Sequence, residues 1–315
     1  MYMNIAAITF MALALLARGL SPAQTGVVLG VLPVVQVITQ PVWGVLADTS
    51  GQTKRLLTLA CAGLVAASVG LWAARAFVPL LLAMVAVAVM RAGILPLHAV
   101  FALAATAVAA WLPQGARPVA PAGVQFRHFT ASPGLGTLVA AAALTGMGMG
   151  VNNTFLAVFL RDLGGPGWTL GAAFAIAAMG EVPLMANMQR LIHRFGVSRL
   201  VGVGLLVLPV RWGLYALLHS PWPILPLQLL HSVAIACLEV AGVLLVRDLT
   251  RPEWSATAQA FYGAALMGLG PSAGTVMAGA IYEWRGLHTV FGVSVIPALA
   301  AWLLFAGLHP RRSAR

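Results

Sequence analysis

The feature that most constrains the fold is a series of apolar segments, each about 20 residues long, that fills most of the chain. A segment of this length crosses a bilayer as an α-helix, because lipid offers no partners for backbone N–H and C=O groups. Only 8% of the 315 residues are charged, whereas an average soluble domain is about one quarter charged. The sequence therefore predicts an all-α, polytopic transmembrane helical bundle and excludes a soluble or disordered chain.

Turn and charge signals divide the apolar sequence into predicted spans. The first begins near Met1 with no basic segment before it, so we expect a retained span and not a signal peptide. The predicted spans lie near residues 2–19, 25–46, 56–74, 77–96, 135–159, 168–188, 199–218, 222–246, 257–281 and 287–307.

These spans form two unequal halves. The N-terminal half, 1–112, holds four spans and a shorter apolar remnant, 98–112, whereas the C-terminal half, 135–310, holds six spans. The segment 113–134 is rich in Pro, Gly and Ala and predicts a central cytoplasmic linker, and 311–315 form a basic tail. The first half is thus shortened after Pro96.

Basic residues predict the orientation, because Lys and Arg are enriched in cytoplasmic loops. Ten of them fall on one predicted face and four on the other, which places both termini and the basic loops in the cytoplasm. The net charge of +11 does not indicate nucleic-acid binding, since the basic residues are dispersed and form no stripe.

Nothing in the sequence predicts an enzyme. Cys61 and Cys237 lie in separate apolar segments, so neither a disulfide framework nor a metal site is indicated. The segment Gly146–Gly150 is rich in glycine but follows no strand, which excludes a dinucleotide site. We expect no metal and no cofactor.

A short motif follows the second predicted span. Gly44 permits close helix packing, Asp48 caps or pairs across a loop, Gly51 permits a tight turn, and Lys54 and Arg55 hold the loop in the cytoplasm. This segment resembles the loop signature of the major facilitator superfamily, although any short basic loop between spans is an alternative reading.

A degraded copy of the motif lies 145 residues later, with Gly196 in the place of Gly51 and Arg199 in the place of Lys54. Two such loops fit the parallel repeats of that superfamily. The resemblance implies two halves of six spans, a site between them and alternating access, so this chain, with about 10–11 spans, departs from the pattern of 12. The segments 19–24, 181–183, 211–215 and 228–231 together resemble the lactose-permease-like branch.

Ionisable residues inside spans are costly and usually functional. Glu181, Arg211, His231 and Glu239 lie within spans of the second half. In the lactose-permease-like branch, a Glu, an Arg and a His on successive second-half helices form the proton and sugar site, and Glu181, Arg211 and His231 match them in order. A carboxylate near a buried Arg takes up a proton when the Arg moves away. Ala234 stands where that branch has a second Glu, and Glu239, two turns beyond His231, is the candidate substitute.

An alternative is that Glu181 and Arg211 form a buried ion pair that only fixes helix packing. Further candidates for contact with the solute are Asn152, Asn153, Gln36 and Tyr262, for which hydrogen bonds between helices are the alternative.

The sequence thus predicts a secondary active transporter of a small polar solute, sugar- or nucleoside-like, coupled to protons and embedded in a lipid bilayer. The shortened first half leaves two alternatives, a membrane receptor or scaffold that no longer transports, and an incomplete record of an intact transporter.

Overall fold

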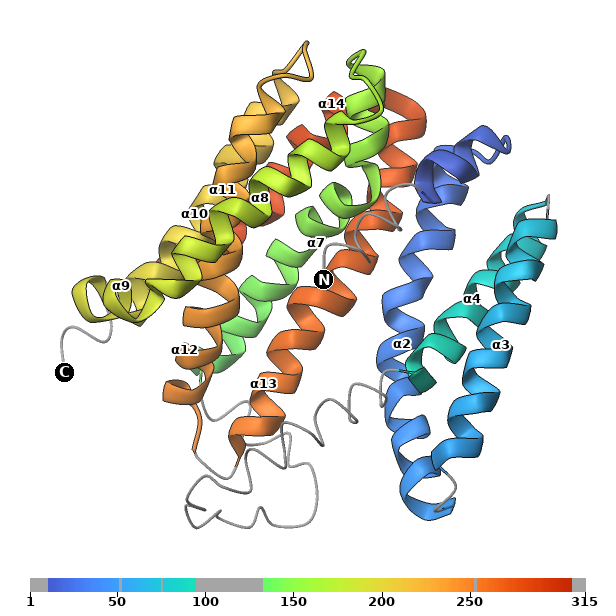
Figure 1. Ribbon diagram of the computed structural model, residues 1–315. Coiled ribbons are helices and arrows are strands. Elements are labelled where there is room, and N and C mark those ends of the chain that lie inside the picture. Colours follow the sequence, from blue (N-terminus) through green and yellow to red (C-terminus); the bar gives the residue numbers. More distant parts are fainter. Residues whose placement is uncertain (1–10, 51–52, 75, 95–132, 252–253, 308–315) are drawn as a thin grey trace.

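The structure is a computed structural model that describes residues 11–50, 53–74, 76–94, 133–251 and 254–307 (Figure 1). Within these ranges the chain is helical and contains no strand. The remnant 98–112, the linker as far as residue 132 and the tail 311–315 lie outside the described residues. The N-terminal part comprises a helical stretch at 11–17, α2 (Pro22–Ser50), α3 (Thr53–Ala73) and α4 (Phe77–Ile94).

The C-terminal part is longer and packs around α7. Its α-helices are α7 (Pro133–Asp162), α8 (Thr169–Ala186), α9 (Met188–Phe195), α10 (Val197–Ala216), α11 (Ile224–Ala236), α12 (Gly242–Leu249), α13 (Ser255–Ala264) and α14 (Gly270–Ala306). Two π-helical segments, η2 (Cys237–Ala241) and η4 (Ala265–Leu269), connect α11 to α12 and α13 to α14. Five helical stretches of the described residues are long and apolar enough to cross a membrane: 134–162, 169–186, 197–216, 224–249 and 257–306.

The last stretch contains two spans, as the sequence predicts. Gly286 has φ 75° and ψ 174°, a conformation open to glycine, and it divides α14 into two helical parts. The second part returns along α10, and His288 Nε2 lies 2.6 Å from the Leu218 carbonyl oxygen at the end of that helix. The turn at Gly286 therefore makes an antiparallel helix pair from one continuous element.

At three places the helices extend beyond the predicted spans. Helix α2 continues to Ser50, so Gly44 and Asp48 lie in its last turns and not in a loop. Residues Met188–Phe195, predicted as connection, form α9, whose Leu191 packs inward while Arg194 is exposed. Helix α7 begins at Pro133, because proline is favoured in the first turn of a helix.

The ends of the bundle differ in charge. We call the end formed by α9 and the α12–α13 connection the basic end, because it carries the exposed residues Arg190, Arg194, Arg199, Arg247 and Arg251. The opposite end holds the start of α2 and the turn at Gly286.

Glycines allow α7 and α14 to touch along their backbones. A Cβ atom on Gly150 would lie 2.6 Å from Pro271 Cα, and one on Gly274 would lie 2.6 Å from Met147 Cα. Gly146 and Gly270 are in similar contact, so each helix contributes two glycines four residues apart. This spacing is typical of closely packed membrane helices, and it brings α7 next to the middle of the bundle.

The two parts of the chain meet at the opposite end, where α2 begins. Ser21 and Gln24 form a reciprocal capping box, with the Ser21 N–H 3.1 Å from Gln24 Oε1 and the Gln24 N–H 3.3 Å from Ser21 Oγ. The Glu283 carboxylate of α14 accepts bonds from the Ser21 hydroxyl and from the Ala23 N–H. Toward the basic end, α2 and α13 diverge (Figure 1).

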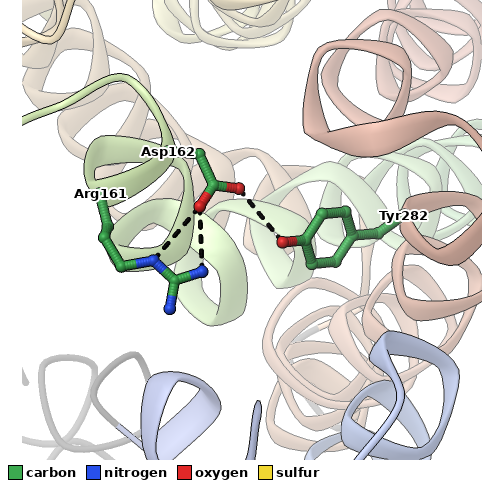
Figure 2. A network of polar contacts seen from close by, with 3 residues as sticks. All are labelled: Arg161, Asp162 and Tyr282. Atoms are coloured by element: carbon green, nitrogen blue, oxygen red, sulfur yellow. Dashed lines mark hydrogen bonds and ion pairs between the residues drawn. The ribbon is translucent and has the colours of Figure 1, made fainter. Parts of the chain in front are cut away.

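Tyr282, the residue before Glu283 in α14, contacts the last residue of α7. The Tyr282 hydroxyl donates to Asp162 Oδ2 at 3.1 Å, and the Arg161 guanidinium donates to Asp162 Oδ1 at 3.0 Å (Figure 2). Consecutive residues of α14 thus bind α7 and α2, so the opposite end is a junction of three helices.

Candidate functional site

A buried arginine connects three helices of the C-terminal part. Arg211, near the end of α10, is fully buried, and its Nη2 donates to Asn152 Oδ1 of α7 at 3.0 Å and to Gln228 Oε1 of α11 at 2.9 Å. Its Nη1 lies 3.4 Å from His231 Nδ1. The structure therefore brings Asn152, a separate candidate from the sequence, together with Arg211 and His231, which the sequence had placed in one site.

Tyr215 holds the guanidinium from one turn further along α10. Its hydroxyl accepts a bond from Arg211 Nη2 at 2.9 Å, and its ring lies 4.8 Å from Arg211 Cζ. The ring face attracts the cation, and the hydroxyl satisfies one of its donors. Phe159 and Phe291 pack against Tyr215 and exclude water from this side.

The hydrogen-bond partners of Arg211 are neutral. Within the described residues, the pairs of opposite charge closer than 4 Å are exposed: Arg161 with Asp162, and Arg247 with Asp248. The ion pair between Glu181 and Arg211, which the sequence left as an alternative, is not among them. A buried cation whose hydrogen-bond partners among the described residues are neutral is costly, because its charge has left water.

Two donors of this cluster lack acceptors. Arg211 Nε and Gln228 Nε2 are buried and have no hydrogen-bond partner among the described residues. Buried polar groups in folded proteins almost always have a hydrogen-bond partner, so two donors without acceptors in the same cluster need an explanation. An oxygen from a bound solute or a water molecule is the kind of acceptor that both donors require.

The carboxylates form a second group. Glu181 is buried in α8, which packs on α11 through the Ser232 hydroxyl bonded to the Ala177 carbonyl at 2.8 Å. Glu239 lies in η2, on the continuation of α11, and is half-buried. An ionised carboxylate inside a membrane-spanning helix is costly and is usually kept for a function.

Glu239 lies in a π-helical segment, which the sequence did not reveal. The Gly242 N–H donates to the Cys237 carbonyl, five residues back, so this turn holds more residues than an α-turn. In a widened turn each residue advances by a smaller angle about the helix axis. Glu239 therefore lies closer to the helix face that carries His231 than it would in a regular α-helix. Segments of this kind occur often at functional sites.

Tyr262 belongs to this second group. Its hydroxyl donates to the carbonyl of Leu238, the residue before Glu239 in η2, at 2.8 Å. The bond joins α13 to η2, and a hydrogen bond between helices is the alternative that the sequence analysis names for Tyr262.

For the other predicted site and motif residues the structure gives less detail. Asn153 is half-buried, and its Oδ1 accepts a bond from Asn152 Nδ2 at 3.3 Å. Gln36 lies in α2 with an undescribed side chain. Of the motif residues, Gly44 and Asp48 end α2, Lys54 and Arg55 begin α3, and Gly51 lies outside the described residues.

Sequence reasoning missed Gln228 and Tyr215 as site residues. Each had a signal in its spacing: Tyr215 follows Arg211 by four residues and Gln228 precedes His231 by three, so each pair shares a helix face. Neutral residues in apolar spans attract less notice than charges, although Gln228 is 1% exposed and provides a contact as short as any other made by Arg211.

Known proteins resemble this chain in sequence and in fold. The maltose permease of Geobacillus stearothermophilus is 30% identical over 158 residues, which are 47% of this chain and 40% of the permease. The human major facilitator superfamily domain-containing protein 6-like is 27% identical over 171 residues, 54% of this chain and 29% of that protein. The crystal structure of the nucleoside transporter NupG superposes with a TM-score of 0.77 at 14% identity, covering 95% of this chain and 93% of that chain.

These alignments extend over less than half the length of the curated relatives that they match. The apolar helices and the shared fold identify an integral, multi-pass membrane protein. The family model described as "MFS_1 like family" matches residues 2–110 and 114–293. The chain therefore belongs to this family of the major facilitator superfamily.

Proposed function

We propose that this chain takes part in secondary active transport of a small polar solute, sugar- or nucleoside-like, coupled to protons. The observation that carries the proposal is the buried Arg211, which binds α7, α10 and α11 through neutral groups. A charge buried within a membrane helix bundle is rarely kept without a function. Relatives named as a maltose permease and a nucleoside transporter support the solute class.

The polar cluster suits recognition of hydroxyl groups. Asn152 and Gln228 present both donors and acceptors, and Arg211 Nε and Gln228 Nε2 lack acceptors of their own. A sugar or ribose hydroxyl accepts from such donors and donates to the amide oxygens in return. Because α7, α10 and α11 each contribute a polar group, the affinity for a solute bound in this cluster depends on how these three helices are placed relative to one another.

Glu181 and Glu239 are the proposed proton site. Both carboxyl groups lie in helices that are long and apolar enough to cross a membrane, and carboxyl groups at such positions commonly carry protons in transporters. The neutral state is also the one that crosses a bilayer region at the lowest cost. His231, in contact with Arg211, lies on the helix that continues to Glu239 and is the candidate link between solute and proton.

Alternating access is supported by where the two parts of the chain touch. Glu283 and Gly279 of α14 contact the first turns of α2, whereas α2 and α13 diverge toward the basic end (Figure 1). This arrangement corresponds to a state closed at the opposite end. By the positive-inside rule the basic end faces the cytoplasm, so the state is inward-facing.

Reconstituted protein tests the proposal. Proteoliposomes with an internal pH-sensitive dye are exposed to a panel of sugars and nucleosides, and the expected result is solute-dependent proton uptake by the wild type. Glu181→Gln should remove proton uptake while solute binding persists, and Arg211→Gln should remove both. An absence of solute-dependent flux over the whole panel, with Glu181→Gln indistinguishable from wild type, would contradict coupled transport.

A further inference from the structure

A second cavity lies away from the Arg211 cluster, near the basic end. It has a volume of about 380 Å³ and is formed where α8, α9, α10 and α11 meet. We call it the α9 groove, and it is lined by apolar side chains together with one charged residue, Arg199. Its size lies within the range of small-molecule sites, which is about 300–1,000 Å³.

The α9 groove is continuous with the lipid-facing surface. Phe195 and Val203 line it and are 42% and 43% exposed. Further along α10, the apolar residues Leu206 and Val210 are also exposed, as expected for a helix face against acyl chains. An occupant can therefore enter sideways from the bilayer without passing the solute site.

The charged residues on α9 and in the lining of the α9 groove are positive. Arg199 lines the groove, and Arg190 and Arg194 lie on α9 beside it. Among the described residues none of the three is within ion-pair distance of a carboxylate: Arg190 bonds the Asn187 side chain at 3.1 Å, and Arg194 lies 5.2 Å over the Phe195 ring. Three exposed arginines on α9 and the start of α10, the helices that border an apolar groove, fit an anionic head group with a hydrocarbon tail.

We propose that the α9 groove binds an anionic phospholipid, with one acyl chain against Leu184, Leu200 and Val233 and the phosphate group on Arg199. The occupant is a lipid and not a water-soluble ligand, because apart from Arg199 the lining offers only apolar side chains. It is anionic because a zwitterionic head group gains less from three uncompensated arginines. A lipid here braces α9 against α10 and α11, next to the start of η2.

Native mass spectrometry of the full chain tests this, with phosphatidylglycerol and phosphatidylcholine of identical acyl chains as probes. We expect the wild type to retain phosphatidylglycerol preferentially and Arg199→Gln to lower that retention about tenfold, as for loss of one charge-assisted contact. Val203→Trp, which fills the groove but keeps the arginine, should lower retention of both lipids. Arg251→Gln, an exposed arginine at the same end but outside the groove, is the matched control.

The outcomes separate the alternatives. Equal retention of both lipids by the wild type overturns the proposal, as does unchanged phosphatidylglycerol binding in Arg199→Gln. An equal loss in Arg251→Gln and Arg199→Gln would mean that lipid collects on a diffuse basic surface, which also overturns it. A thermal melt of each variant in detergent verifies that Val203→Trp is folded.

Discussion

The Glu283 carboxylate accepts a hydrogen bond from the Ser21 hydroxyl at 2.9 Å, across 262 residues of sequence. The same oxygen accepts the Ala23 N–H at 3.2 Å, within the first turn of α2. An anion at this position also interacts favourably with the positive end of the helix dipole. The contact therefore holds α14 of the C-terminal part against α2 of the N-terminal part.

Glu283→Gln should weaken closure at this end. Glutamine keeps the shape but loses the charge, so its contact with the start of α2 is weaker and the closed population falls about two- to fivefold. Spin labels at Trp72→Cys and Leu217→Cys, exposed positions near this end, report the separation by pulsed electron resonance in a background without Cys61 and Cys237. Arg285→Gln, two residues away, serves as control, and an unchanged distance distribution in Glu283→Gln would refute the role of the contact.

Arg211→Lys should show whether solute binding needs only the positive charge at this position or also the hydrogen-bonding geometry of the guanidinium group. Lysine keeps the positive charge, but its compact ammonium group cannot reach Asn152, Tyr215 and Gln228 together as the planar guanidinium does. Loss of even one hydrogen bond to a charged group weakens solute binding by about tenfold. Binding is measured by the solute-induced shift of the melting temperature. If Arg211→Lys binds solute as the wild type does, charge alone is sufficient and the proposed hydrogen-bonding role is wrong.

Asn152→Ala should affect binding more than folding. The substitution removes one acceptor of Arg211 on α7 but leaves Tyr215 and Gln228 in place, so the guanidinium stays anchored from α10 and α11. Asn153→Ala is the matched control, because it removes the adjacent amide, whose Oδ1 accepts a bond from Asn152 Nδ2. We expect weaker solute binding in Asn152→Ala than in Asn153→Ala, with similar melting temperatures. A larger loss of binding in Asn153→Ala would reverse the assignment.

Much of the helical architecture was predictable, because span length and the turn residues between spans are local properties of the sequence. The reversal at Gly286 and the separation of α10 from α11 follow from such signals. The polar cluster was predictable in part, since Arg211 and His231 are conspicuous in apolar spans. Their joint contact with Asn152 depends on how α7 packs against α10 and α11, and no local pattern determines that packing.

The π-helical turn at Glu239 was beyond sequence reasoning. A widened turn is stabilised by tertiary contacts, and the bond from Tyr262 to the Leu238 carbonyl is one of them. Gly242 allows that approach, since a Cβ there would lie 2.9 Å from Tyr262 Cζ. Helical periodicity alone therefore misplaces Glu239 relative to His231.

Tyr262→Phe should loosen this turn. The substitution removes the hydrogen bond to the Leu238 carbonyl, a loss of about 1 kcal/mol in the free energy of unfolding. Since Glu239 lies in the same turn, we also expect weaker proton coupling without loss of solute binding. Melting and dye-reported proton uptake measure the two effects. Tyr282→Phe, which loses an exposed bond to Asp162, is the control, and equal effects of both variants on coupling would contradict the link to η2.

Gly150→Ala should disrupt the bundle more than any exposed glycine substitution. The new methyl group would lie 2.6 Å from Pro271 Cα, and a backbone atom cannot move aside as a flexible side chain does. Forcing α7 away from α14 costs about 1–3 kcal/mol or more, and it also displaces Asn152 from Arg211. Gly136→Ala in the same helix meets nothing within 4 Å, so its melting temperature should stay the same or rise because alanine favours the helix. Melting curves of the two variants in detergent are the measurement. If they coincide, close packing of α7 on α14 does not stabilise the fold.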